Sequence, residues 1–185
     1  MAAIALLGGT FDPVHNAHLA MGRAALAALP VAQVVFLPTG STKYRTPARA
    51  SAAHRLAMLR LAVKGEAKFS VDERELQPSA TGYTVDTLKS FKAENSADLY
   101  FLMGADQLEK LASWHKPGEV RRLAKLAVFA RPGYEVKDAS VKVIPMPPMP
   151  VSASEIRARA ARGESLAGLA PETVANYIER ERLYR

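Results

Sequence analysis

Short apolar runs recur along the chain, and polar turns separate them. AAIALL (2–7) leads into two glycines, AQVVFLP (32–38) ends in a proline, and DLYFLMGA (98–105) contains Gly104 near its end. Unbroken apolar runs of this length are typical of strands that are buried on both faces of a parallel sheet. The pattern predicts strands over 2–7, 32–38, 98–105, 125–130 and 141–145, with a short strand or edge segment within 68–77.

Segments with apolar residues at helical spacing follow most of these runs. Asn16, Ser51 and Ser152 are candidate N-caps because their side chains can accept a hydrogen bond from the first helical turn. Gly163 marks a predicted helix end, and Pro171 a predicted first helical position. The predicted helices cover 16–29, 51–63, 84–91, 106–112 and 152–163, with a last one from 171.

This alternation predicts an α/β fold, a doubly wound open parallel sheet followed by a helical C-terminal part (152–185). We expect residues 1–185 to form one domain. Ligands of such sheets bind beyond the carboxyl ends of the strands, near a switch in strand order. The loops after Leu7, Pro38, Leu102 and Ile144 should therefore share one rim.

Composition narrows the classes of partner. The chain has 185 residues, a formal charge of +7 and no cysteine, which excludes a disulfide scaffold, a thiolate zinc site and a cysteine nucleophile. No apolar run approaches the roughly 18 residues of a membrane span, and no signal peptide is visible, so we expect a cytoplasmic location without a membrane partner. The positive charge favours anionic partners. A phosphate-rich small molecule fits better than nucleic acid because no run of five basic residues occurs.

The segment GGTFDPVHNAHL (8–19) carries the strongest chemical signal. Gly8 and Gly9 permit a tight turn and close approach of a ligand to the backbone. His15 and His18 lie three apart at a predicted helix start, where imidazoles and free N–H groups can bind a phosphoryl group. A metal site would need a third ligand, and no motif supplies one; Asp12 is expected to order the turn.

This segment resembles the first motif of the nucleotidyltransferase superfamily that carries a His-x-x-His signature, although Ala17 stands where glycine is most common. VSASEIR (151–157) is similar to the second motif, Ile-Ser-Ser-Thr-x-Ile-Arg. With GYTVDTL (82–88), LMGADQLEKLASWHK (102–116) and FARPGY (129–134), the chain resembles the bacterial nicotinate-nucleotide adenylyltransferases over nearly its whole length.

The resemblance implies adenylyl transfer from ATP to nicotinate mononucleotide, giving nicotinate adenine dinucleotide and pyrophosphate. ATP and nicotinate mononucleotide would be the partners, and Mg²⁺ would be bound through the ATP phosphates rather than by a protein metal site. Two alternatives stay open: an enzyme like pantetheine-phosphate adenylyltransferase, and a non-catalytic module that binds nucleotides or nucleic acid on the same fold.

The resemblance also implies roles for individual residues. His15, His18, Lys43 and Arg157 would be catalytic, although Arg45 or Arg49 could replace Lys43 in the loop after the second strand. Asp106 and Trp114 have structural alternatives, a helix cap and a core residue, and Arg131 could lie on the surface instead of beside adenine. The residues expected to bind ATP are Gly8, Gly9, Thr10, Phe11, His15, His18, Gly104, Asp106, Arg131, Ser152, Ser154 and Arg157; those expected to bind nicotinate mononucleotide are Gly9, Lys43, Thr84 and Trp114.

Overall fold

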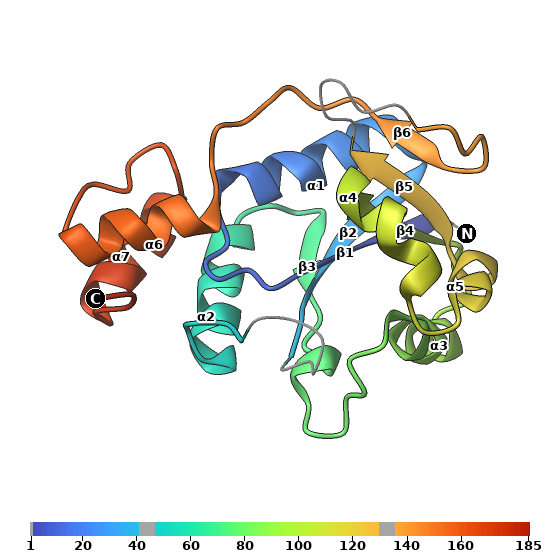
Figure 1. Cartoon of the computed structure of the whole chain (residues 1–185), viewed down its shortest axis with the longest axis horizontal. Coiled ribbons are helices and arrows are strands. Elements are labelled where there is room, and N and C mark those ends of the chain that lie inside the picture. The colour runs from blue at the N-terminus through green and yellow to red at the C-terminus, as the bar shows by residue number, and fades with distance from the viewer. Residues whose placement is uncertain (1, 41–46, 130–135) are drawn as a thin grey trace.

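A computed structural model describes residues 2–40, 47–129 and 136–185. Within them one parallel sheet runs through the molecule in the order β3-β2-β1-β4-β5-β6 (Figure 1). Every neighbouring pair in this order is parallel, as the apolar runs predict. The strands are β1 Ala3–Gly9, β2 Val31–Pro38, β3 Phe69–Val71, β4 Leu99–Gly104, β5 Lys125–Phe129 and β6 Lys142–Ile144.

Helices connect the strands and cover both faces of the sheet (Figure 1). All the helices that the sequence predicts are present, and one short helix, α5, was not predicted. The helices are α1 Asn16–Ala28, α2 Ala52–Val63, α3 Thr84–Glu94, α4 Ala105–Lys110, α5 Pro117–Leu123, α6 Ala153–Arg162 and α7 Glu172–Arg180, with 3₁₀ turns η1 Arg74–Leu76 and η2 Leu111–Ser113.

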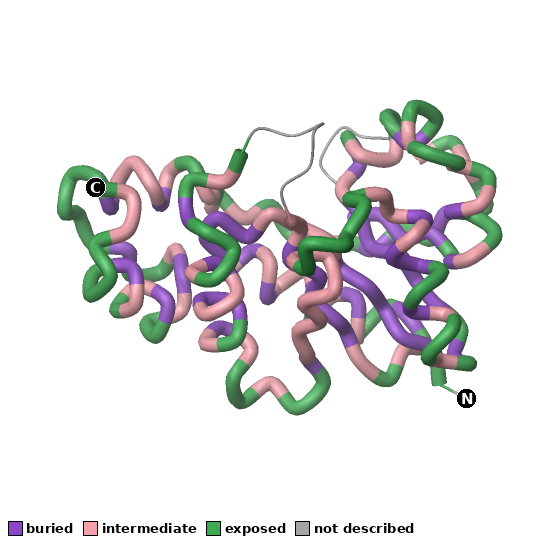
Figure 2. The backbone as a smooth tube through the Cα atoms, turned by 90° about the horizontal axis from the view of Figure 1, so that it is seen from below, coloured by how far each residue is buried: buried purple, intermediate pink, exposed green. Residues whose placement is uncertain are grey.

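The side chains of β1 alternate between two hydrophobic cores. Ala5 and Leu7 point into a core shared with α1, α2, α6 and α7, whereas Leu6 points into a core shared with α3 and α5. The tube drawing shows the buried strands between more exposed helices (Figure 2). A strand that faces two cores needs apolar residues at every position, which explains the unbroken run over 2–7.

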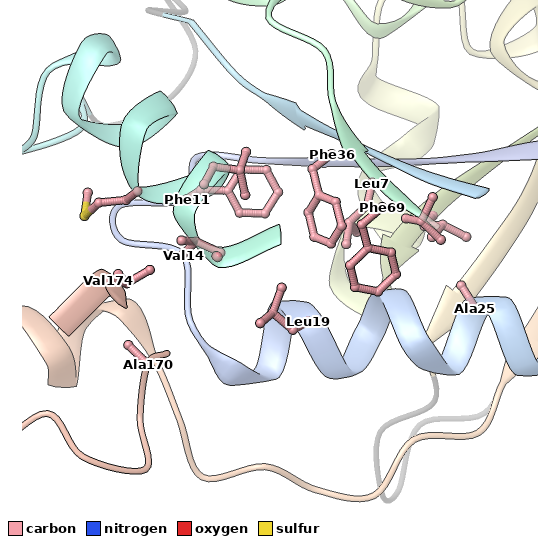
Figure 3. Close-up of a cluster of buried hydrophobic side chains, with 14 of the residues drawn as sticks. Leu7, Phe11, Val14, Leu19, Ala25, Phe36, Phe69, Ala170 and Val174 are labelled. Atoms are coloured by element: carbon pink, nitrogen blue, oxygen red, sulfur yellow. The ribbon is translucent and has the colours of Figure 1, made fainter. Parts of the chain in front are cut away.

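The C-terminal helices pack onto the start of the chain rather than onto the sheet. Ala170 and Val174 lie beside Val14, in the segment that joins β1 to α1 (Figure 3). α7 also packs against α2, where the His54 ring nitrogen Nδ1 lies 2.9 Å from the Tyr177 hydroxyl. The helical part over 152–185 therefore reaches the rim of the sheet at the end of β1.

Two predicted helix starts were wrong in detail, although the helices themselves are confirmed. His15, not Asn16, is the N-cap of α1, because the Asn16 side chain instead donates a hydrogen bond of 2.9 Å to the carbonyl of Gly168. Pro171 is the N-cap of α7 rather than its first helical residue. Ser51 and Ser152 cap α2 and α6 as predicted, and Gly163 ends α6 with φ 68°.

None of the helices within 2–40, 47–129 and 136–185 is long and apolar enough to cross a membrane.

Candidate active site

The predicted rim exists at the carboxyl ends of the central strands. β1 pairs with β2 on one side and with β4 on the other, so the strand order reverses at β1. The loops that follow these strands lie at one edge, and the Thr39 N–H donates a 2.9 Å hydrogen bond to the Gly9 carbonyl there. A topological switch point of this kind is where open α/β sheets bind ligands.

The two histidines of the first motif lie together at the start of α1. Their rings are stacked, with centroids 3.7 Å apart and planes inclined by 23°. The backbone N–H of His15 donates a 3.2 Å hydrogen bond to Nδ1 of His18. His18 thus takes the place of the third helical residue in a capping box, whose side chain accepts from the N-cap N–H. Because Nδ1 is an acceptor, the neutral His18 ring carries its proton on Nε2 and can donate only from there.

Both imidazoles are neutral at physiological pH. Burial lowers the pKa of His15 to about 4. Burial lowers the pKa of His18 well below its usual value, and the neighbouring His15 ring lowers it further. The pair therefore offers neutral hydrogen-bond donors rather than fixed positive charges.

The Phe11 ring packs against His18 and leaves no room for a side chain at position 9. A Cβ on Gly9 would lie 2.9 Å from the Phe11 ring, so any side chain at position 9 would displace that ring. The Phe11 ring is 2% exposed and contacts the edge of the His18 ring, with centroids 4.9 Å apart. Phe11, expected to bind ATP, thus has its side chain in the core (Figure 3).

The Asp12 carboxylate joins its own turn to two distant segments at the rim. Its Oδ2 accepts a 2.7 Å hydrogen bond from the Arg49 N–H, and its Oδ1 accepts from the Ala50 N–H at 3.0 Å. The Tyr184 hydroxyl donates to Oδ1 over 2.9 Å. The carboxylate therefore fastens the entry of α2 and the turn after α7, in addition to the turn in which the sequence placed it.

The second motif meets the first through Arg157. Its Nη1 donates a 2.7 Å hydrogen bond to the backbone carbonyl of Asp12 and lies 4.0 Å from the Asp12 carboxylate. Ser152 caps α6, and its hydroxyl lies 3.1 Å from that of Ser154. Arg157 of the second motif thus contacts the turn of the first motif.

Arg55 is a buried cation of this site that the sequence did not single out. It is 3% exposed, and its Nη1 donates to the carbonyls of Thr10 at 2.7 Å and Thr39 at 2.9 Å. Burial lowers the pKa of Arg55, while nearby Asp12 and Tyr184 oppose this effect. Arg55 therefore holds the loops after β1 and β2 against each other. No local motif marks it.

Three buried side-chain nitrogen atoms of the described residues have no hydrogen-bond partner in the protein. They are His15 Nδ1, Arg55 Nε and Arg157 Nε, and all three belong to this cluster. Buried polar atoms normally find a partner, so the three atoms mark this cluster as a place where the protein leaves polar groups unsatisfied.

A cavity of about 750 Å³ opens beside this cluster, next to Gly8 and Thr39. Thr84 and Trp114, the residues expected to bind the nicotinate nucleotide, both line it. The Trp114 ring lies edge-on to Phe101 with centroids 6.0 Å apart. The cavity is further lined by Glu75, Gly82, Tyr83, Asp106, Gln107, Lys110, Ser113, His115 and Lys116.

The backbone N–H groups beside this cavity differ in whether they already have an acceptor. The Trp114 N–H already donates to the Leu111 carbonyl at 3.0 Å. Thr84 is the first residue of α3, where the N–H groups have no acceptor within the helix. Tyr83, which precedes it, stacks on His115 with centroids 4.3 Å apart.

Of the remaining expected site residues, some lie away from the histidine pair and others are not among the described residues. Gly104 ends β4, and a Cβ there would lie 2.9 Å from Oδ1 of Asp106. Asp106, expected on the ATP side, lines the cavity that holds Trp114. Lys43, Arg45 and Arg131 lie outside the described residues, and Arg49 is exposed.

The described residues hold no group of three histidine, aspartate or glutamate side chains that could bind a metal ion. The donors that face one another at the rim are imidazoles, guanidinium groups and hydroxyls. This set suits an anion better than a divalent cation.

Comparisons with known proteins agree with this geometry. A family model described as cytidylyltransferase-like matches residues 6–159. The chain is 43% identical to a probable nicotinate-nucleotide adenylyltransferase of Bordetella petrii over 100% of both chains, and 40% identical to one of Chromobacterium violaceum over 100% of this chain and 99% of the relative. A solved Plasmodium falciparum nicotinic acid mononucleotide adenylyltransferase complexed with NaAD has the same fold, with a TM-score of 0.83, 18% identity and coverage of 100% and 98%.

Proposed function

This chain belongs to the cytidylyltransferase-like family and, within it, to the nicotinate-nucleotide adenylyltransferases, and we propose how its rim performs their reaction. The reaction transfers an adenylyl group from ATP to nicotinate mononucleotide, with nicotinate adenine dinucleotide and pyrophosphate as products, and is a step of NAD biosynthesis. The full-length identity of about 40% carries this conclusion.

The chemistry requires positioning more than proton transfer. A phosphate oxygen of nicotinate mononucleotide forms a bond to the α-phosphorus of ATP, while the bond from that phosphorus to the bridging oxygen breaks and pyrophosphate leaves. The nucleophile is already an anion at neutral pH, so no general base is needed. The protein must align the two phosphates and stabilise the charge that spreads over the transferred group.

We propose that His18 and His15 bind the α-phosphate. The His18 Nδ1 atom is held by the His15 N–H, so the proton on Nε2 is the one this ring has available to donate. A buried, neutral donor whose direction is fixed beforehand stabilises developing negative charge well because little reorganisation is needed. The Gly9–Thr10 backbone would lie beside the same phosphate, and Lys43 would approach from the loop after β2.

Arg157, Ser152 and Ser154 are proposed to hold the β- and γ-phosphates that leave as pyrophosphate. They lie at the N-terminal part of a ten-residue helix, α6, whose positive dipole end favours anions. A guanidinium group binds two phosphate oxygens through a planar, fixed pair of N–H donors, a geometry that an ammonium group lacks.

The cavity lined by Thr84 and Trp114 is proposed to take the pyridine ring and its carboxylate. The Trp114 ring would pack on the pyridine, and the N–H groups at the start of α3 would bind the carboxylate. Donors of this kind favour an anion over an amide, because an amide offers them its N–H₂ group as well as its oxygen. Asp106 and Arg131 are proposed to contact the adenosine part of ATP.

Mg²⁺ is proposed to enter as part of the substrate Mg·ATP, bound through its phosphates. The metal would offset the negative charge of the triphosphate, and the protein residues would orient the complex. We also propose that residues 1–185 act as a single domain, because both hydrophobic cores share the one sheet.

The test is pyrophosphate release from Mg·ATP with three acceptors: nicotinate mononucleotide, nicotinamide mononucleotide and 4′-phosphopantetheine. We expect kcat/KM for nicotinate mononucleotide to exceed that for the amide by about a hundredfold or more, since the amide leaves buried donors poorly matched. An equal or better amide would overturn the carboxylate assignment. Preference for 4′-phosphopantetheine would overturn the proposed acceptor.

A further inference from the structure

Asp12 contributes to the active site with two different groups. Its backbone carbonyl accepts from Arg157, whereas its carboxylate accepts from the Arg49 and Ala50 N–H groups and from the Tyr184 hydroxyl. The carboxylate is nearly inaccessible, because Asp12 is only 6% exposed. The buried carboxylate and the carbonyl that holds Arg157 therefore belong to the same residue of the turn after β1.

Tyr184 is held in place by the turn that follows α7. The Leu183 N–H donates to the Ile178 carbonyl at 3.0 Å, which folds this turn back onto the helix. The Tyr184 backbone has φ 68°, a left-handed conformation that a bulky residue adopts only when its surroundings enforce it. Its ring packs against the core around α1, α2 and α7. The hydroxyl is thereby aimed at Asp12.

We propose that Tyr184 is a positioning residue for adenylyl transfer, acting through Asp12 on Arg157. This inference rests on the proposed function, in which Arg157 binds the phosphates that leave. Three hydrogen bonds reach the Asp12 carboxylate from the part of the chain that the structure describes. Two come from backbone N–H groups, and the Tyr184 hydroxyl supplies the third, from a side chain.

The geometry gives the mechanism of this coupling. Arg157 Nη1 lies 4.0 Å from Oδ2 of Asp12, slightly too far for a hydrogen bond. If the tyrosine hydroxyl is removed, Oδ1 of Asp12 keeps only the Ala50 N–H as a donor, and the carboxylate can then attract a cation beside it more strongly. Arg55, the other cation beside Asp12, is already bound to two carbonyls. Arg157 would then pair with Asp12 and turn away from the phosphates.

Burial and the Asp12 carboxylate raise the pKa of the Tyr184 phenol. The phenol is therefore protonated at neutral pH, where it donates its hydrogen bond to Asp12.

The experiment is a double-mutant cycle on the full chain with Tyr184→Phe and Arg157→Lys. We expect Tyr184→Phe to lower kcat by about tenfold and to leave KM for nicotinate mononucleotide within about twofold, since the acceptor cavity is untouched. In the Arg157→Lys background the same change should lower kcat by less than about threefold, because the group through which it acts is already altered. Additive losses, or an unchanged kcat in Tyr184→Phe, would overturn the proposal.

Tyr177→Phe is the matched control. Tyr177 lies on α7, and its hydroxyl also makes a 2.9 Å hydrogen bond, but to His54 rather than to Asp12. We expect its kcat to stay within about twofold of the wild-type value. A loss equal to that of Tyr184→Phe would show that any weakened contact of the C-terminal helices has this effect, and would also overturn the proposal.

A second measurement separates this inference from the proposed function. Binding of a non-hydrolysable ATP analogue with Mg²⁺ needs no acceptor, so the cycle can be repeated with its affinity as the readout. We expect Tyr184→Phe to weaken binding about threefold when Arg157 is present and not in the lysine background. Failure of the wild-type chain to use nicotinate mononucleotide would reject the function alone, whereas an unchanged analogue affinity would reject the role of Tyr184.

Discussion

The phosphate end and the acceptor end of this rim are built in opposite ways. At the phosphate end, Asp12, His15 and Arg55 are 6%, 7% and 3% exposed, and their partners come from segments up to 172 residues away. At the acceptor end, Thr84 and Trp114 are half-buried and line an open cavity of about 750 Å³. The residues of the phosphate end are buried and hydrogen-bonded to distant segments, whereas those of the acceptor end line an open space.

This difference follows from what each end has to do. Charge stabilisation works best from donors that are already oriented and shielded from water, so the phosphate end is rigidly tied together. Recognition of the acceptor needs a shaped space with a few directed donors, so the residues there face a cavity more than they face one another. We therefore expect changes at the phosphate end to affect kcat and folding, and changes at the acceptor end to affect KM.

The largest expected effect is that of His18→Ala at the phosphate end. Loss of the pre-oriented Nε2–H donor should lower kcat by about 10²–10³, the usual cost of removing one donor to a developing oxyanion. His18→Gln should recover about tenfold of this loss, because its amide nitrogen reaches as far as Nε2, whereas His18→Asn should not. Pyrophosphate release measures all three.

His54→Gln serves as the control for the histidine variants, since His54 lies on α2 and bonds to Tyr177. Its kcat should stay within about twofold of wild type. Retention of more than a tenth of the activity in His18→Ala would remove this residue from the chemistry and weaken the contrast between the two ends.

Arg55→Met tests whether the phosphate end is tied together as strongly as its burial suggests. The change leaves the Thr10 and Thr39 carbonyls without their donor and removes the buried positive charge beside Asp12, so the free energy of unfolding should fall by about 2–4 kcal/mol. Arg60→Met on the same helix breaks an exposed pair with Glu73 and should cost less than about 1 kcal/mol. Urea unfolding compares them; equal losses would contradict the interpretation.

The sequence predicts the sheet and the two motifs well because their signals are local. Apolar runs mark the strands, and the three-residue spacing of His15 and His18 places both rings at one helix start. The helix α5 was missed because Pro117 and Gly118 are typical of a turn, although Pro117 here serves as the first residue of a seven-residue helix.

The connections that make the phosphate end rigid could not be predicted. Asp12 bonds to residues 37 and 172 positions away, and Arg55 to a carbonyl 45 positions away. Side-chain hydrogen bonds over such distances leave no periodic pattern in the sequence. The choice of His15 over Asn16 as the cap is also a tertiary effect, because Asn16 is bound to the carbonyl of Gly168.

Trp114→Ala is the smallest expected effect and tests the acceptor end directly. Removing the ring should raise KM for nicotinate mononucleotide by about tenfold, the loss expected for one aromatic stacking contact, while kcat and KM for ATP change by less than about twofold. Trp114→Phe should keep most of the stacking and serves as the matched variant. The Trp114 ring also packs on Phe101, so urea unfolding must be measured on the same proteins. A fall in stability with equal rises in both KM values would make Trp114 a packing residue, and the acceptor end would then need another partner for the pyridine ring.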